Sequence, residues 1–361
     1  MTDLSLNRMA PILRLAHRSN ASDIHLVAGV PPAFRIDGEI ILADAPPLER
    51  DQTKALVFEF LNPLQREALE RDWELCFSVQ SEEFGRFRVT VYYHAGNPEL
   101  AIRRCNTEIP TREELGLPEV VEELARRRSG LILVTGPTGS GKTTTLNFMI
   151  DLINSERRCK IVTIEDPIEY VHRRKKAIIV QQEVRTDVKS FSKALVHVLR
   201  QDPDVVCVGE MRDLETISTA LIAADTGHLV IATVHTPNAL QTMERIVSVF
   251  PSEQQNQVTA QLANCIEGIV AQRLIPRADK KGRVPATEIL VANMAVRALI
   301  RENDFHKLTS VMETGRRWGM QTLDESLRQL YEGAQITYDA ALSNARDPNA
   351  LRRDEEQQPT V

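Results

Sequence analysis

A glycine-rich segment at residues 136–143 constrains the fold of this chain more than any other feature. It runs Gly136-Pro-Thr-Gly-Ser-Gly-Lys-Thr143 and matches the pattern G-x-x-x-x-G-K-[ST] in full. An apolar run at 130–134 precedes it, and a helical pattern from Lys142 to about Ile153 follows it. The segment therefore predicts a strand, a tight loop and a helix in that order, the arrangement of a P-loop.

The chemistry of this loop suits a nucleoside triphosphate. Glycines let the backbone curl so that its N–H groups and the helix N-terminus point at phosphate oxygens. Lys142 would bring a positive charge to the β- and γ-phosphates, and the Thr143 hydroxyl would ligate Mg²⁺ directly. We therefore expect ATP and Mg²⁺ to bind through Gly136, Thr138, Gly139, Ser140, Gly141, Lys142, Thr143 and Thr144.

Two catalytic carboxylates are expected after apolar strands further along the chain. Val205–Val208 continues into Gly209 and Glu210, a Walker B arrangement, and Glu165 follows the apolar run at 160–164. The carboxyl ends of strands in an open α/β sheet face one crevice, so we expect both side chains to lie there. The alternative is that both carboxylates lie in solvated loops. Glu210 would orient water as a base or bind magnesium through water, and the sequence leaves both roles open.

The larger part of the chain predicts an α/β fold. Apolar runs alternating with helical stretches indicate a mostly parallel sheet covered on both faces. Ser252 and Gln255 are spaced as a capping box, so we expect a helix from there to about Leu274, then a short strand near 284–291 and three helices. The expected sheet strands are 131–135, 160–164, 205–208, 229–234 and, as a fifth candidate, 177–184.

Residues 1–105 predict a separate small α+β domain. Helical spacing at 4–17 and 51–71 alternates with β-type segments at 22–26, 33–41, 86–93 and 100–104. A linker rich in proline and glycine is expected at 106–118. The remaining predicted boundaries are 119–292 for the ATPase core, 293–351 for a C-terminal helical region and 352–361 for a polar tail.

Composition limits the class of protein. The chain has 361 residues, 42% of them hydrophobic and 26% charged, which is ordinary for a globular protein. Its net charge of −6 argues against a protein held on nucleic acid by bulk charge. No apolar run approaches the roughly 18 residues of a membrane span, no signal peptide follows Met1, and the cysteines are scattered. We therefore expect a cytoplasmic protein with no transmembrane segment of its own and no nucleic-acid partner.

Two histidines bracket the apolar run Leu229–Val234. His228 and His235 are seven residues apart, which puts them on opposite faces and roughly 23 Å apart along a strand. That separation argues against a shared zinc ion, and a single histidine at the end of a core strand is often a hydrogen-bonded structural residue.

Three further motifs carry a family resemblance. They are Thr163-Ile-Glu-Asp-Pro-Ile-Glu-Tyr170, Val208-Gly-Glu-Met-Arg-Asp-Leu-Glu-Thr216 and Thr226-Gly-His-Leu-Val-Ile-Ala-Thr-Val-His-Thr236. These resemble the Asp box, the Walker B motif and the His box of the secretion ATPase superfamily of hexameric motors. The resemblance implies a RecA-like P-loop core, preceded by a small PAS-like N-terminal domain and followed by C-terminal helices, in a homohexamer.

Within that superfamily the chain most resembles the PilT-type retraction ATPases of type IV pili. The segment Ala295-Val-Arg-Ala-Leu-Ile-Arg-Glu302 is similar to that group's signature A-I-R-N-L-I-R-E at six of eight positions. The sequence also contains no tetracysteine pattern, and we expect the protein to lack the zinc site and the extra N-terminal domain of pilus assembly ATPases. The resemblance implies a motor for pilus retraction and twitching motility, acting from the cytoplasmic face of the inner membrane on a platform protein, with other pilus ATPases as further partners.

Several alternatives stay open at this point. Ala298 replaces the asparagine of the signature, which leaves room for an accessory retraction paralogue. A pilus assembly or type II secretion ATPase is another possibility. From other classes, a nucleotide-gated scaffold and a nucleic-acid translocase are rivals; intact Lys142, Thr143 and Glu210 argue against the first, and the acidic net charge against the second.

The resemblance also implies roles for residues outside the P-loop. Arg88 and Arg103 match the N-terminal arginines that approach the γ-phosphate in such rings, with Arg86 and Arg104 as weaker candidates. An arginine there would stabilise charge on the transferring phosphoryl group, whereas the plain alternative is a solvated strand arginine. By the same resemblance His228 would sense the nucleotide. Basic runs at 126–128 and 173–176 are expected to be solvated faces or contacts with neighbouring subunits or an acidic partner.

Overall fold

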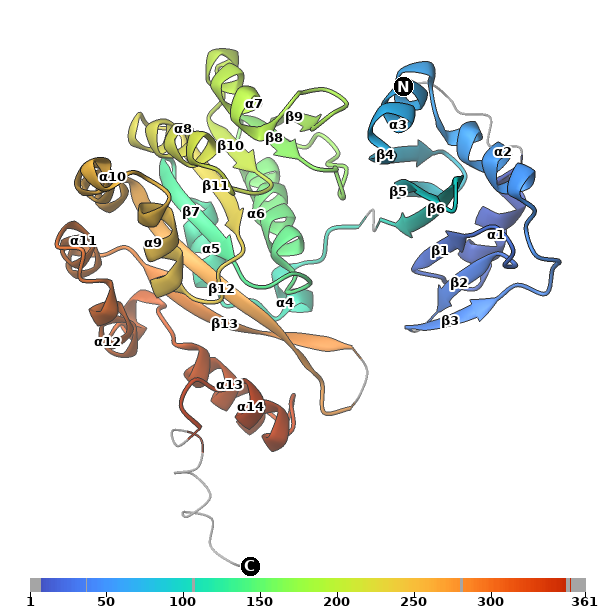
Figure 1. The fold of residues 1–361 in the computed structure, drawn as a ribbon. Coiled ribbons are helices and arrows are strands. Elements are labelled where there is room, and N and C mark those ends of the chain that lie inside the picture. Colours follow the sequence, from blue (N-terminus) through green and yellow to red (C-terminus); the bar gives the residue numbers. More distant parts are fainter. Residues whose placement is uncertain (1–7, 37, 106–107, 280–281, 349–350, 352–361) are drawn as a thin grey trace, which may run out of the picture. The chain divides into compact units, whose positions relative to one another are not determined.

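The computed structural model describes residues 8–36, 38–105, 108–279, 282–348 and 351 (Figure 1). Contacts divide the chain into two compact units. The smaller comprises the described residues of Met1–Glu108 together with Asp166–Val171, and the larger those of Ile109–Glu165 and His172–Val361. The polar tail expected at 352–361, the start of the first predicted helix and part of the predicted linker lie outside the described residues.

The smaller unit is built on an antiparallel sheet in the order β3-β2-β1-β6-β5-β4. Along β5, Phe87, Val89 and Val91 are buried on one face, as their alternation predicts, while Arg86, Arg88 and Thr90 occupy the other. The elements are α1 (Ala10–Arg18), β1 (Asp23–Leu26), β2 (Ala33–Ile36), β3 (Glu39–Leu42), α2 (Arg50–Phe60), α3 (Pro63–Asp72), β4 (Glu74–Ser81), β5 (Gly85–His94) and β6 (Asn97–Arg104).

The larger unit contains a seven-stranded sheet in the order β13-β12-β7-β11-β10-β8-β9. Every neighbouring pair is parallel except β12 with β13, so the predicted parallel-rich α/β sheet is confirmed. The strands are β7 (Gly130–Thr135), β8 (Lys160–Glu165), β9 (Ile178–Glu183), β10 (Val205–Val208), β11 (Leu229–Val234), β12 (Ile266–Pro276) and β13 (Arg283–Val291).

Helices surround this sheet and continue beyond it to the C-terminal region (Figure 1). They are α4 (Arg112–Leu115), α5 (Val120–Ala125), α6 (Lys142–Glu156), α7 (Phe191–Val198), α8 (Leu214–Asp225), α9 (Ala239–Ser248), α10 (Ser252–Cys265), α11 (Met294–Arg301), α12 (Leu308–Thr314), α13 (Leu323–Glu332) and α14 (Tyr338–Asn344). Short 3₁₀ turns occur at Leu199–Gln201, Phe305–Lys307 and Arg316–Trp318. None of the described helices combines the length and hydropathy needed to cross a bilayer.

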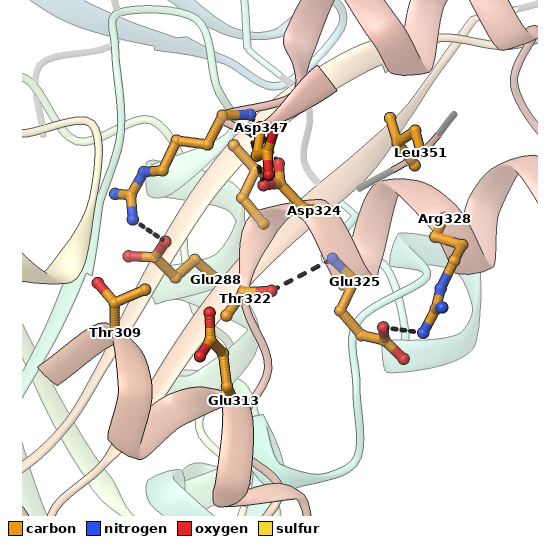
Figure 2. A pocket seen from close by; sticks show the side chains of 11 residues that line it. Glu288, Thr309, Glu313, Thr322, Asp324, Glu325, Arg328, Asp347 and Leu351 are labelled. Carbon is orange, nitrogen blue, oxygen red and sulfur yellow. Dashed lines mark hydrogen bonds and ion pairs between the residues drawn. The ribbon is translucent and has the colours of Figure 1, made fainter. Parts of the chain in front are cut away.

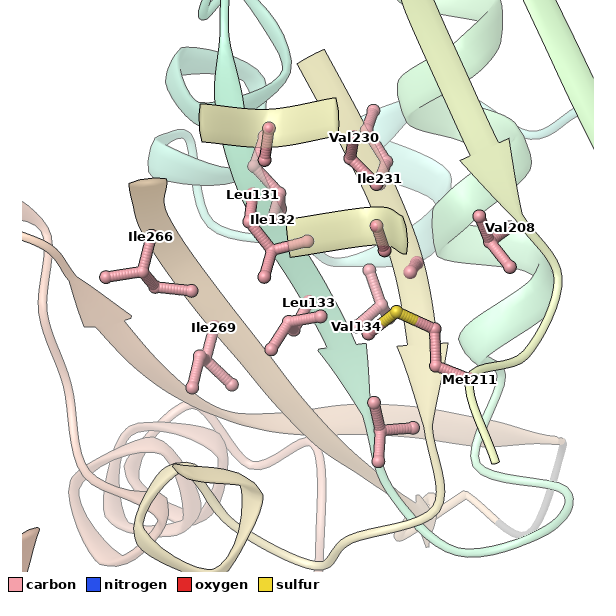
Figure 3. Packing of buried hydrophobic residues seen from close by; sticks show 14 of the residues in the cluster. Leu131, Ile132, Leu133, Val134, Val208, Met211, Val230, Ile231, Ile266 and Ile269 are labelled. Carbon is pink, nitrogen blue, oxygen red and sulfur yellow. The ribbon is translucent and has the colours of Figure 1, made fainter. Parts of the chain in front are cut away.

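The core of the larger unit lies on both sides of the central strands. β7, β10 and β11 are buried along their whole length, as continuous apolar strands between two helical layers must be. Ile132 of β7 lies opposite Ile231 of β11, and Leu133 of β7 lies opposite Ile269 of β12; Figure 3 shows these side chains in the core. This packing fixes the ends of the strands, which carry the polar residues described below.

The segment after α10 differs from its prediction. The helix expected to reach Leu274 ends at Cys265, and Ile266–Pro276 instead form β12 between β7 and β13. Its β-branched residues, among them Ile266, Ile269 and Val270, fit a buried strand better than a helix. The capping box is also wrong: the N-cap is Pro251, and the Gln255 side chain donates to the Phe250 carbonyl at 3.0 Å instead.

The helix expected at 51–71 is two helices. Pro63 has no N–H to continue the helical ladder, and Asn62 begins α3 by accepting the Gln65 N–H at 2.9 Å. Two strands, β2 and β3, occupy the β-type segment expected at 33–41, and β4 was not predicted.

Candidate nucleotide-binding site

The P-loop joins the buried strand β7 to α6 and is fixed by close backbone packing. A Cβ atom at Gly136 would overlap the backbone oxygen of Gln272 and lie 2.5 Å from Ser140 Oγ, so only glycine fits there. Gly141, with a φ of 89°, is the N-cap of α6 and supplies no capping side chain. The first N–H groups of the helix are therefore left for an external acceptor, which suits a phosphate.

Lys142 lies beneath this loop. Its side chain is buried, and Nζ donates to the carbonyl oxygens of Gly136 at 2.9 Å and Pro137 at 3.0 Å. Burial lowers the pKa of Lys142, and the nearby Glu210 carboxylate opposes that shift. The ammonium group thus holds the loop closed while remaining at its anion-binding face.

Gln272 of β12 supports the loop from behind, and the motif analysis does not identify it. The side chain is buried; Nε2 donates to the Ser140 carbonyl at 2.7 Å, and Oε1 accepts from Thr145 Oγ1 at 2.9 Å. One amide therefore ties the loop to the first turns of α6. Its partners lie more than a hundred residues away in sequence, so no local pattern could reveal it.

Glu210 and His235 meet at the same edge of the sheet as the P-loop. β10 and β11 are parallel neighbours, so the residues that follow them emerge side by side. His235 Nε2 lies 3.1 Å from Glu210 Oε1, Arg212 also pairs with that oxygen, and His235 Nδ1 lies 3.5 Å from Thr138 Oγ1. Burial first, and then the charge of Lys142, lowers the pKa of His235.

Glu165 also lies at this edge, at the end of β8. The carboxylate is buried and accepts from Thr163 Oγ1 at 2.6 Å and Gln181 Nε2 at 3.0 Å. Because β8 pairs with β10, Glu165 and Glu210 follow adjacent parallel strands. The structure therefore places both predicted carboxylates after the carboxyl ends of neighbouring strands.

The structure does not bring His228 to the P-loop of this chain. His228 precedes β11, at the amino-terminal edge of the sheet, and its carbonyl accepts the N–H of Gly130 at the start of β7. The ring Nδ1 lies 3.0 Å from the Ala223 carbonyl. His235, at the other end of β11, occupies the position beside the loop that the family resemblance led us to expect for His228.

Arg88 and Arg103 are direct cross-strand partners in the smaller unit. Arg103 Nε donates to Asp23 Oδ1 at 2.7 Å, while Arg88 lies 3.9 Å from Glu169 and donates Nε to the Cys76 thiol at 3.4 Å. The two predicted arginines thus lie in one row on the polar face of the sheet. Of the weaker candidates, Arg86 is buried and bonds the Ile168 carbonyl at 2.8 Å, and Arg104 lies on the other face of β6.

Comparison with known proteins places the chain in a family. The model of the type II/IV secretion system protein family matches residues 6–358. The chain belongs to this family. It is 43% identical to the type IV pilus "retractation" ATPase PilT of Pseudomonas aeruginosa over 93% of this chain and 98% of that relative. It is 40% identical to the type IV pilus ATPase PilU of the same organism, over 94% and 89% of the two chains.

Solved structures of the secretion family share the fold. The crystal structure of the pilus retraction motor PilT with bound ADP superposes with a TM-score of 0.89 at 46% identity, covering 98% of this chain and all of that one. The Legionella pneumophila ATPase DotB gives a TM-score of 0.83 at 28% identity, over 94% and 96% of the two chains. The expected α/β P-loop core and C-terminal helices are therefore confirmed as the fold of this secretion family member.

The C-terminal signature segment of this secretion family protein forms α11. Val296 and Ile300 are fully buried on one side of this helix. Arg297 Nη1 donates to the Ala263 and Asn264 carbonyls at 2.8 and 2.6 Å, and Arg297 Nη2 to Glu267 at 2.7 Å. Arg297 thus caps the end of α10, while Ala298 is exposed, so an amide at that position would lie on the surface.

A cavity of about 200 Å³ lies in the C-terminal helical region, and its walls carry several acidic side chains (Figure 2). Asp324 accepts the N–H groups of Arg346 at 2.7 Å and Asp347 at 3.0 Å, and Glu288 pairs with Arg346 at 3.4 Å. These bonds tie the segment after α14 to α13. The cavity therefore lies where the segment after α14 is bonded to α13, and no P-loop residue lines it.

The two basic runs are both hydrogen-bonded to the C-terminal end of α6 in the larger unit. Arg157 Nη1 donates to the Arg127 carbonyl at 3.1 Å, which joins the end of α6 to the run at 126–128. Asn154 of α6 donates to the Arg173 carbonyl at 2.8 Å, which joins the same end to the run at 173–176. Some of these cations are paired, such as Arg126 with Glu156 and Lys175 with Asp151. The chain as a whole has a net charge of −6, so these runs are local concentrations of basic residues.

Proposed function

We propose that this protein is an ATP-hydrolysing motor that retracts type IV pili. One observation carries the proposal: Lys142, Glu210 and His235 meet beside an uncapped helix N-terminus, in a chain similar almost end to end to the retraction ATPase PilT. A P-loop alone would fit many nucleotide-binding proteins. The carboxylate placed beside the loop makes hydrolysis the better explanation.

The P-loop residues would hold the ATP phosphates. The backbone N–H groups from Gly136 to Gly141 and the start of α6 supply neutral donors, and Lys142 supplies charge. The Thr143 hydroxyl in the first turn of α6 and the Glu210 carboxylate are hard oxygen donors of the kind Mg²⁺ prefers, so the residues fit this ion. We assign Thr143 as a direct ligand and Glu210 as one acting through water. Bound Mg²⁺ would neutralise charge on the phosphates.

Glu210 would orient the attacking water and accept its proton. Arg212 Nε donates to one oxygen of Glu210, and His235 Nε2 lies 3.1 Å from the same oxygen, so these two side chains would hold the orientation of the carboxylate. Glu165 is a second acidic group held at the same edge by Thr163 and Gln181. We assign nucleotide sensing to His235 in place of His228, because His235 is the histidine that reaches both the loop and Glu210.

Arg88 and Arg103 would supply positive charge to the transferring phosphoryl group. Their neighbouring positions on β5 and β6 allow both to act at one site, and Asp23 holds Arg103 extended. In a ring of like subunits such arginines would link nucleotide hydrolysis to movement of the smaller unit. We propose a homohexamer for this reason.

The motor would act at the cytoplasmic face of the inner membrane on a platform protein of the pilus, together with other pilus ATPases. The joined basic runs at 126–128 and 173–176 would be attracted to anionic lipid headgroups, at about 1 kcal/mol per cation near the surface. This attraction needs no membrane-spanning helix.

The second candidate is an accessory retraction ATPase, because the chain is 40% identical to PilU over 94% of its length. An assembly or type II secretion ATPase is a third. Deleting the gene and restoring it with wild type or Lys142→Ala separates them. We expect deletion and Lys142→Ala to leave piliated cells that do not twitch. Cells without pili would indicate an assembly ATPase. Normal twitching with a reduced retraction force would indicate an accessory retraction ATPase. Normal twitching with an unchanged retraction force would refute the proposal.

A further inference from the structure

Asn147 and His172 form a buried pair behind the P-loop that the proposed hydrolysis does not use. Asn147 lies on α6 and is fully buried, and 8% of His172 is exposed. Asn147 Nδ2 donates to the Thr143 carbonyl at 2.8 Å, and His172 Nε2 lies 2.7 Å from Asn147 Oδ1. A hydrogen-bonded connection thus runs from the residue assigned to Mg²⁺ to the segment that follows Val171.

The two bonds fix the state of the histidine. The Asn147 amide uses its NH₂ on the Thr143 carbonyl, so its oxygen faces His172 and can only accept. His172 must therefore carry its proton on Nε2, and Nδ1 is a buried lone pair with no hydrogen-bond partner among the described residues. Burial lowers the pKa of His172 to about 4, so the ring is neutral at physiological pH. His172 acts as a hydrogen-bond donor in this pair, not as an acid or a base.

The connection continues to the second acidic residue of the site. The backbone N–H of His172 donates to Gln181 Oε1 at 2.9 Å, and Gln181 Nε2 donates to Glu165 Oε1 at 3.0 Å. Thr143 and Glu165 are therefore joined through Asn147, His172 and Gln181 by four consecutive hydrogen bonds, one of them buried and three partly buried.

This path holds both ends of one loop. Asp166–Val171 belongs to the smaller unit, whereas the residues on either side, Glu165 and His172, belong to the larger one. Within the smaller unit the Ile168 carbonyl accepts from Arg86 at 2.8 Å, and Glu169 lies 3.9 Å from Arg88. A movement at the first turn of α6 would thus reach the loop that contacts the arginine strand.

We propose that Asn147 and His172 are positioning residues that transmit nucleotide occupancy of the P-loop to the loop Asp166–Val171. Nucleotide bound at the start of α6 restrains Thr143, and the Asn147–His172 pair passes that restraint to the carboxyl end of the loop. This coupling requires that a nucleotide binds, but it does not require that ATP is hydrolysed. Its place in the force-producing cycle rests on the proposed function.

The test is amide hydrogen exchange of the full-length protein, followed by mass spectrometry, with and without ADP. We expect ADP to slow exchange at 168–173 about tenfold in the wild type, within the usual range of coupling between sites. His172→Phe removes the donor and should abolish this effect while changing the ADP dissociation constant less than threefold. His172→Gln places an amide N–H near the Nε2 position and should restore it.

Asn154→Ala is the matched control. Asn154 lies two turns further along α6, is equally buried, and makes the same kinds of bonds, to the Arg173 carbonyl at 2.8 Å and from the Lys175 N–H at 3.1 Å, without touching Thr143. We expect Asn154→Ala to retain the ADP effect even where it lowers thermal stability.

Two results would overturn the proposal: no ADP effect at 168–173 in the wild type, or an effect that persists in His172→Phe. If Asn154→Ala also lost the ADP effect and His172→Gln did not restore it, the effect would depend on packing in this region and not on the His172–Asn147 hydrogen bond. That result would also overturn the proposal. ATP turnover is measured separately on the same samples. A wild-type protein that shows the ADP effect but releases no phosphate would refute the proposed function and leave the coupling standing.

Discussion

Replacing Gln272 by leucine should weaken nucleotide binding without touching any residue of the P-loop motif. Leucine has nearly the same volume as glutamine but no polar atoms. The change would remove the 2.7 Å bond to the Ser140 carbonyl and the 2.9 Å bond from Thr145 Oγ1, and leave both groups buried without these partners. Each unsatisfied group costs about 1–3 kcal/mol, so with two such groups the native state should lose about 2–6 kcal/mol.

Part of this loss falls on the loop itself, because Ser140 is one of its residues and Thr145 lies in the first turns of α6. We expect ADP to bind about 10- to 100-fold more weakly, equivalent to about 1.4–2.7 kcal/mol, as measured by calorimetric titration of the purified protein. Thermal unfolding of the same samples reports the loss of stability.

Gln321→Leu provides the control. Gln321 Nε2 donates to the Thr287 carbonyl at 3.0 Å and to Thr287 Oγ1 at 2.6 Å; Thr287 is the cross-strand partner of Gln272 on β13, but these bonds involve neither Ser140 nor Thr145. It should lower stability with little change in ADP affinity. If Gln272→Leu destabilised the protein but bound ADP within threefold of the wild type, Gln272 would support the fold and not the loop.

Three further predictions follow from other contacts. The pKa of His172 is about 4, below the ordinary histidine value of about 6.5. Between these two pH values the unfolded chain therefore binds more protons than the folded one. The free energy of unfolding should fall as the pH decreases through this window, by up to about 3 kcal/mol. His172→Gln should flatten this dependence in denaturant titrations, and an unchanged slope would contradict the assignment. Arg103→Ala should lower ATP turnover by about 10²- to 10³-fold, whereas Arg104→Ala on the other face of β6 should not; equal rates for the two variants would remove Arg103 from the mechanism. The wild type should co-sediment with vesicles that contain anionic lipid and not with neutral vesicles, and replacing the cations at 173–176 by glutamate should abolish this binding. Binding that survived the change would place the membrane contact elsewhere.

The sequence predicts the parts of the site that depend on local pattern. The P-loop motif fixes a strand, a loop and a helix within about 25 residues, and Glu210 follows an apolar strand whose end must lie at the same edge. Strand direction could also have separated the two histidines. In a parallel sheet the residue after a strand lies on the P-loop edge and the residue before it does not, which places His235 on that edge and His228 on the opposite one.

Other residues of the site depend on contacts that no local pattern contains. Gln272 reaches Ser140 across 132 residues, and His172 reaches Asn147 across 25. Gln272 was further hidden because its segment was expected to continue the helix α10. The β-branched residues of Ile266–Pro276 find their place only between β7 and β13, which is a property of the sheet and not of the segment.

The most direct test of the central claim is phosphate release by purified Glu210→Ala compared with the wild type, alongside ADP binding by both. If Glu210 orients the attacking water, the wild type should hydrolyse ATP while Glu210→Ala binds ADP within a few-fold of the wild-type affinity and releases phosphate at least 100-fold more slowly. An undiminished rate in Glu210→Ala, or no turnover by the wild type, would contradict the account of this protein as an ATP-driven motor with Glu210 at its centre.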